Sequence, residues 1–76
     1  MIEHDLGPQP LDALMTTLGI ANADLVKVST EQLSFKMVQK ARKGRRLSPH
    51  VKMKVLRAFQ LTRSERLFSI QELFNY

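Results

Sequence analysis

Residues 34–46, "SFKMVQKARKGRR", place six Lys or Arg in thirteen positions and still keep apolar residues at helical spacing. Four polar residues stand at i, i+3, i+4 and i+7, which puts them on one face of a helix: Lys36, Gln39, Lys40 and Lys43. Three apolar residues gather on the opposite side: Met37, Val38 and Ala41. Without a carboxylate beside the lysines, like charges disfavour the helix by roughly 0.2–0.5 kcal/mol per pair unless an anion binds. The stretch therefore predicts an amphipathic helix whose outer face is basic.

Gly44 marks the end of this helix, because glycine adopts the left-handed conformation of a C-cap without strain. The beginning of the helix is open to two interpretations. Ser29 and Gln32 make a capping box that would start a helix directly after Ser29. Alternatively, Ser34 is the N-cap and Leu33 fills the turn before it.

Start and stop signals predict two helices before this one. Pro10 suits the first position of a helix over residues 10–18, and Gly19 is suited to its C-cap. Asn22 is a favourable N-cap for a short second helix.

Two further helices are predicted after it. A Ser-Pro pair opens a helix over residues 49–60, and Thr62 with Glu65 forms a capping box for a last helix over residues 63–75. Residues 1–9 lack periodicity and contain a Gly-Pro pair, which predicts a flexible N-terminal arm. Because no stretch alternates with a period of two, the predicted fold is all-α, with five short helices.

Length and composition limit the classes of function. A chain of 76 residues with 43% hydrophobic content is expected to fold as one small domain. There is no cysteine, and His4 and His50 are far apart, so we expect no metal and no cofactor. Paired carboxylates, a Ser-His arrangement and a Gly-rich phosphate loop are also missing, so we expect neither enzyme activity nor a small-molecule substrate.

The sequence also bears on the location of the protein. No apolar run approaches the roughly 18 residues that cross a bilayer, and the first residues do not resemble a signal peptide. We therefore expect a cytoplasmic protein, associated with the nucleoid if the source is bacterial, and no membrane partner.

The positive charge is concentrated in one interval. The formal net charge is +5, and the residues between Glu31 and Glu65 include ten of the twelve Lys and Arg but no Asp or Glu. Such a field attracts a polyanion, because Lys and Arg displace counterions from phosphate backbones. A membrane-surface helix would carry large apolar residues opposite its basic face, whereas here that side holds Met, Val and Ala. Nucleic acid is therefore the favoured partner.

Three stretches, in this order and spacing, resemble the lambda repressor and Cro-like helix-turn-helix family: "LMTTLGIANADL" (14–25), "MVQKARKGRRLSP" (37–49) and "RAFQLTRSERLF" (57–68). The resemblance implies a DNA-binding domain over residues 10–76 whose recognition helix, about 34–43, enters the major groove. The chain departs from the family pattern in one region. The segment between Leu25 and Val38 is about two residues longer than the usual pattern, which has a turn of roughly 3–4 residues between these helices, and it lacks a turn glycine.

The resemblance also implies roles for individual residues. Four would face base edges: Phe35, Lys36, Gln39 and Lys40. Four would contact phosphates: Asn22, Lys43, Arg45 and Arg46. Lys can donate to guanine and Gln can pair with adenine in the major groove. For Phe35 two interpretations remain, a partly buried core residue or an apolar contact with a thymine methyl group or a base.

The C-terminal segment carries more large apolar residues than a peripheral helix needs. Leu67 and Phe68 match positions at which the family packs inward. Four others would then be in excess and available to a partner: Ile70, Leu73, Phe74 and Tyr76. A homodimer through this helix would place two recognition helices about 34 Å apart on DNA, although the same patch would also suit another protein.

These observations together predict sequence-specific binding of double-stranded DNA by a regulator of transcription. Two alternatives belong to other classes: an RNA-binding or ribosome-associated protein, and an antitoxin-like protein-interaction module.

Overall fold

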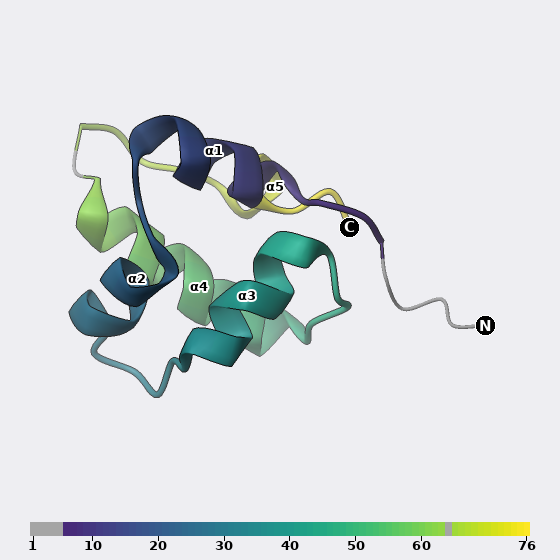
Figure 1. Cartoon of the computed structure of the whole chain (residues 1–76), viewed down its shortest axis with the longest axis horizontal. Coiled ribbons are helices and arrows are strands. Elements are labelled where there is room, and N and C mark those ends of the chain that lie inside the picture. The colour runs from purple at the N-terminus through teal and green to yellow at the C-terminus, as the bar shows by residue number, and fades with distance from the viewer. Residues whose placement is uncertain (1–5, 64) are drawn as a thin grey trace.

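Short helices make up the secondary structure of the chain in the computed structural model, which describes residues 6–63 and 65–76. Five helices and no strand occur among these residues. They are α1 (Pro10–Leu18), α2 (Asn22–Val28), α3 (Phe35–Lys43), α4 (Pro49–Thr62) and α5 (Ile70–Leu73). Helix α2 packs against α3 and α4, while α1 packs against α3 and α5 (Figure 1). The all-α class with five short helices is confirmed.

Helix α1 ends at the predicted C-cap, Gly19, but the N-cap of α2 differs from the prediction. Gly19 is left-handed, with φ of 71°, and the Ile20 N–H donates to the Met15 carbonyl at 2.8 Å. Asn22 is the first helical residue rather than the N-cap. Ala21 takes the N-cap position, and its N–H donates to the Asp24 carboxylate at 2.8 Å.

Of the two possible starts for α3, the structure selects Ser34. Its Oγ accepts a hydrogen bond from the Met37 N–H at 3.1 Å, the usual N-cap geometry. Ser29 Oγ instead bonds to the N–H and the carbonyl of Glu31, both at 3.1 Å. Leu33 is buried beneath the turn. The residues between Val28 and Phe35 therefore form a connection rather than helix.

The C-terminal segment differs from the prediction. A helix over residues 63–75 was expected from Thr62 and Glu65, but among the described residues of this segment only α5 is helical. The Thr62 hydroxyl donates to the Phe59 carbonyl at 2.7 Å, inside α4, instead of capping a new helix. The capping interaction lies at Ser69, whose N–H donates to the Glu72 carboxylate at 2.8 Å.

A single side chain explains why the segment before α5 stays irregular. The Gln60 amide donates to the carbonyls of Arg63 and Arg66 at 2.7 and 2.6 Å, and its carbonyl accepts from the Phe68 N–H at 2.7 Å. Backbone groups that a helix would pair internally are thus paired with α4. Leu67, expected to point inward, is 85% exposed.

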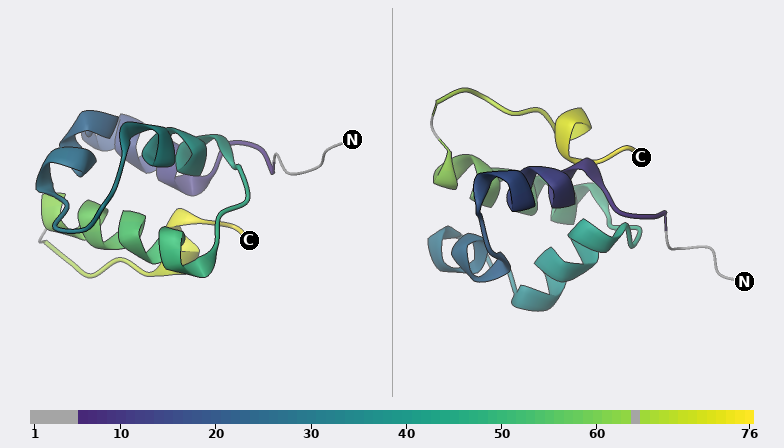
Figure 2. Two further views of the ribbon diagram at one scale, coloured as in Figure 1. Left: turned by 90° about the horizontal axis from the view of Figure 1, so that it is seen from below. Right: turned by 45° about the horizontal axis from the view of Figure 1, so that its top comes forward.

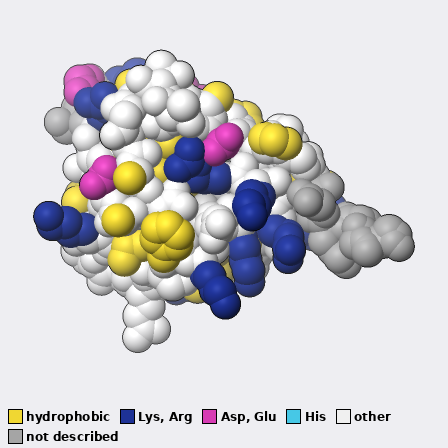
Figure 3. All heavy atoms as spheres, viewed as in Figure 1, with side chains coloured by type: hydrophobic (Ala, Val, Ile, Leu, Met, Phe, Trp, Pro, Cys, Tyr) yellow, Lys and Arg dark blue, Asp and Glu magenta, His cyan; other side chains and the backbone are white. Residues whose placement is uncertain are grey.

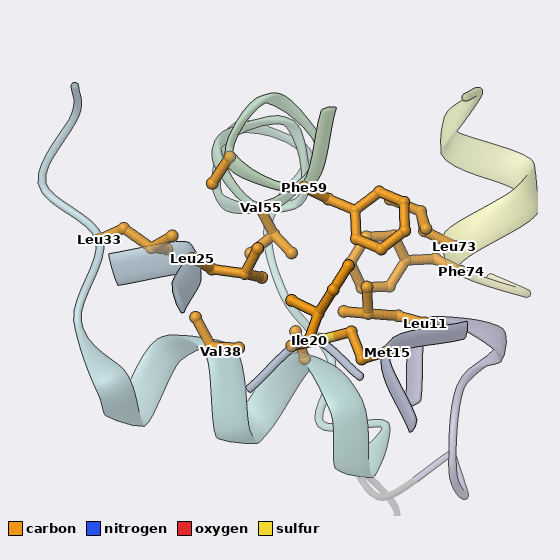
Figure 4. Packing of buried hydrophobic residues seen from close by; sticks show 12 residues of the cluster. Leu11, Met15, Ile20, Leu25, Leu33, Val38, Val55, Phe59, Leu73 and Phe74 are labelled. Carbon is orange, nitrogen blue, oxygen red and sulfur yellow. The ribbon is translucent and has the colours of Figure 1, made fainter. Parts of the chain in front are cut away.

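The core runs between α4 and the other helices (Figure 4). Twelve hydrophobic residues are buried in it: Leu11, Met15, Ile20, Leu25, Leu33, Val38, Ala41, Val55, Ala58, Phe59, Leu73 and Phe74. The predicted partner surface is therefore wrong for Leu73 and Phe74, which are core residues. Ile70 and Tyr76 are half-buried and pack against the core, and their contact with a partner stays a prediction. Phe68 also packs inward, edge-on to Phe59 with ring centroids 4.9 Å apart.

The predicted flexible arm over residues 1–9 is only partly covered by the structure, since residues 1–5 lie outside the described residues. Residues 6–9, in contrast, are held by hydrogen bonds to the rest of the domain. The Leu6 N–H donates to the Gly44 carbonyl at 2.8 Å. Gly44 itself has φ of 94°, and a Cβ added to it would overlap the Gly7 carbonyl.

Gln9 fixes the end of this segment. Its N–H donates to the Arg42 carbonyl at 3.1 Å, and its buried side chain donates to the Gly7 carbonyl at 3.0 Å. The Gln9 side-chain carbonyl accepts from the Asn75 N–H at 2.8 Å. Residues 6–9 therefore belong to the folded domain.

Arg42 joins three helices through its guanidinium group. The side chain of Arg42 is only 20% exposed. The group donates from α3 to Asp12 of α1 at 2.7 Å, to the Asn22 side-chain carbonyl of α2 at 2.8 Å and to the Thr16 hydroxyl of α1 at 3.1 Å. Charge-assisted, multiply bonded arrangements of this kind are the stronger class of hydrogen bond.

We predict that Arg42→Ala destabilises the domain by about 2 kcal/mol, because it removes three hydrogen bonds from a charged donor. The matched control is Arg57→Ala, which removes an equally short carboxylate pair, to Glu31 at 2.6 Å, from the exposed surface. Urea unfolding followed by circular dichroism measures both. Equal losses for the two variants would contradict the special role of Arg42.

Candidate nucleic-acid interface

The outer face of α3 lines a hollow in the surface, here called the basic hollow. Its volume is about 190 Å³, and its lining residues are Lys36, Gln39, Lys40, Lys43 and Arg45. The first four are those that the helical wheel placed together, and all four are exposed. Val38 and Ala41, on the opposite side of α3, are fully buried. Burial of that side fixes the direction in which the basic hollow faces.

The carboxylates of the described residues are engaged elsewhere. Four ion pairs occur among these residues: Asp12 with Arg42 at 2.7 Å, Glu31 with Arg57 at 2.6 Å, Glu65 with Arg63 at 3.5 Å and Glu72 with Arg66 at 2.8 Å. Asp24 caps α2. No residue of the basic hollow has a carboxylate partner within the described part of the chain. Figure 3 shows Lys and Arg side chains gathered over α3, with an acidic side chain only at the edge of this group that faces α1.

The long connection before α3 is tied to α4. Arg57 makes two hydrogen bonds to the Glu31 carboxylate, which lower the pKa of Glu31 and raise the pKa of Arg57. Lys54 Nζ donates to the Gln32 carbonyl at 3.2 Å. The extra length noted in the sequence is therefore anchored, and it does not loosen the start of α3.

Phe35 is the first residue of α3, and its side chain is 53% exposed. Phe35 is therefore not one of the buried core residues, and its contact with a thymine methyl group or a base stays a prediction. At i and i+4, Phe35 and Gln39 are neighbours on the helix surface. An aromatic ring therefore borders the basic hollow at its N-terminal end.

The loop between α3 and α4 carries the two predicted phosphate-binding arginines. Arg45 lines the basic hollow, and the Arg46 guanidinium lies 5.9 Å from the centroid of the Tyr76 ring. The Tyr76 hydroxyl accepts from the Leu47 N–H at 3.0 Å and donates to the Arg45 carbonyl at 3.1 Å. Burial raises the pKa of Tyr76, so the phenol stays protonated and able to donate.

Asn22 does not line the basic hollow. Its side-chain carbonyl accepts from Arg42, which places it in the contact between α2 and α3. The predicted phosphate contact of Asn22 thus rests on its position near the start of α2 alone, whereas the other predicted residues of the site lie on α3 or on the loop after it.

Two residues that shape the site were not among the predicted ones. Arg42 received no role in the site from the sequence. Its place on the wheel, beside Val38 rather than with the lysines, was a signal that it points toward neighbouring helices. Tyr76 was assigned to a partner surface, and no local pattern in the sequence indicates its contact with residues 45–47.

No three His, Cys, Asp or Glu of the described residues lie close enough together to hold a metal ion. None of the helices described for this chain is long and apolar enough to cross a membrane.

Comparison with known proteins returned no match, whether with family models, with curated proteins or with solved structures.

Proposed function

We propose that this protein binds double-stranded DNA by placing α3 in the major groove, and that it regulates transcription from a preferred sequence. The observation that carries the proposal is the basic hollow, in which exposed cations are gathered on one helix face without a carboxylate from the described residues. Unpaired like charges are unfavourable in the free protein and become favourable against phosphates.

The dimensions and chemistry of α3 suit this partner. A helix with its side chains is about 10–12 Å across, and the major groove of B-DNA is about 12 Å wide. Lys36, Gln39 and Lys40 carry donors and acceptors that pair with base edges. Arg45 and Arg46 follow at the end of the helix, where they suit phosphate contacts that hold the protein in register.

The rigidity of α3 also supports the proposal. The helix is capped at Ser34, joined to α1 and α2 through Arg42, and preceded by a connection anchored on α4. Side chains on such a support need little ordering when they bind, and this favours selective recognition. The packing of α2 against α3 and α4 is in keeping with the helix-turn-helix resemblance.

The test of the proposal is selection from a random duplex library at two salt concentrations. We expect one enriched motif, with affinity that falls steeply as salt rises, since each neutralised phosphate contributes about 0.9 to the logarithmic slope. Single-stranded RNA serves as the competitor. Equal binding of all duplexes, or tighter binding of the RNA, would contradict the proposal.

Two substitutions separate base contacts from phosphate contacts. Lys40→Ala is expected to cost about 1–3 kcal/mol on the selected site and to relax its preference, whereas Arg46→Ala weakens every sequence nearly alike. Binding isotherms on selected and scrambled duplexes measure both effects.

Arg66→Ala is the matched control for these two variants, because it also removes one positive charge but lies beside Glu72, with which it pairs, near α5. It should leave both affinities almost unchanged. Identical losses for Lys40→Ala on the two duplexes would mean that α3 does not read bases.

Phe35 is expected to contact the methyl group of a thymine. Removing that methyl group, by replacing single thymines of the selected site with uracil, should weaken binding about fourfold at one position, since a buried methyl group is worth roughly 0.8 kcal/mol. Phe35→Ala should weaken binding similarly and abolish the response to uracil. If the variant still responds to uracil as the unmodified protein does, another residue makes the contact.

A further inference from the structure

Tyr76 connects the C-terminal segment to the loop between α3 and α4. Its hydroxyl bonds to the carbonyl of Arg45 and to the N–H of Leu47, the two residues on either side of Arg46. The two views of Figure 2 show this segment ending close to that loop. A residue 31 positions along the chain from Arg45 thus holds the backbone that carries the predicted phosphate contacts.

The ring of Tyr76 is itself fixed from several sides. Lys52 Nζ lies 4.1 Å from the ring centroid and donates to the Tyr76 carbonyl at 2.8 Å. Phe74, a core residue, packs edge-on to the ring with centroids 5.8 Å apart. The hydroxyl is therefore presented to the loop from a position set by α4 and by the core.

The loop has a second anchor at its beginning. The N–H of Arg45 donates to the Lys40 carbonyl at 3.1 Å, and the Gly44 carbonyl accepts from Leu6. Among the described residues, the next hydrogen bonds to the loop after the N–H of Arg45 are those of the Tyr76 hydroxyl. Without that hydroxyl, the carbonyl of Arg45 and the N–H of Leu47 would exchange these bonds for water, and the backbone around Arg46 would be less restrained.

We propose that Tyr76 is a positioning residue for DNA binding, which holds the backbone that carries Arg45 and Arg46 so that their side chains can contact phosphates along the edge of the groove. This role rests on the proposed function. Tyr76 touches no base or phosphate itself, and it acts through the backbone of the loop. Its contribution is therefore independent of sequence and grows as salt is lowered.

Tyr76→Phe tests the role, because it keeps the ring and removes only the hydroxyl. At 0.1 M salt we expect affinity to fall about threefold to eightfold on selected and scrambled duplexes alike, and the logarithmic salt slope to decrease by up to about 1, the value of one phosphate contact. Amide hydrogen exchange at Leu47 should become faster in the free protein, since its N–H loses its acceptor.

Two comparisons distinguish positioning from a general loss of stability. Leu73→Val trims a buried side chain of α5 without touching the loop, so it should lower the melting temperature and leave affinity and salt slope unchanged. In an Arg45→Ala/Arg46→Ala background, the further change Tyr76→Phe should have almost no effect on affinity, because the contacts that it positions are already gone.

The outcomes separate this inference from the proposed function. Full affinity and an unchanged salt slope for Tyr76→Phe, with normal binding by the unsubstituted protein, would overturn the role of Tyr76 alone. The same would follow if Tyr76→Phe weakened binding as much in the Arg45→Ala/Arg46→Ala background as without it. An unsubstituted protein that binds no duplex would overturn the proposed function, and the role of Tyr76 in DNA binding with it.

Discussion

The contact of Arg42 with Asp12, Thr16 and Asn22 sets the direction of α3, and most other features depend on it. Within residues 6–63 and 65–76, it is the one point at which side chains of α1, α2 and α3 meet through a charge. Because Val38 and Ala41 are buried on the side of α3 that packs against the domain, the opposite side of α3 faces solvent. The exposed lysines are therefore a consequence of how α3 is attached, as well as of their own polarity.

The described carboxylates of the domain are used structurally. They pair with arginines or cap helices, and in each case they lie away from the basic hollow. The paired and the unpaired positive charges also differ in residue type. Arginines supply the planar, multiply bonded contacts inside the domain, while lysines, which hold a mobile point charge, occupy most of the free face. The outer face of α3 can therefore carry unpaired positive charges while the arginines and carboxylates elsewhere in the domain remain paired.

Local signals in the sequence were sufficient for much of the fold. Pro10, Gly19, Ser48 and Gly44 marked helix ends by their own backbone preferences, and the spacing of the lysines defined the outer face of α3. The errors have a common physical origin. The held residues 6–9 and the contact of Tyr76 depend on partners distant in sequence, and the irregular segment before α5 depends on the nearby side chain of Gln60. Neither kind of pairing leaves a periodic pattern in the residues that it joins.

The bond between Gln9 and Asn75 links residues 66 positions apart. Closing a contact of such separation costs chain entropy, which slows its formation during folding. During synthesis, the bond between the Gln9 side chain and the Asn75 N–H cannot form until residue 75 has left the ribosome. A nascent chain can therefore expose the lysines of α3 before this last tie between the two ends of the described chain is made.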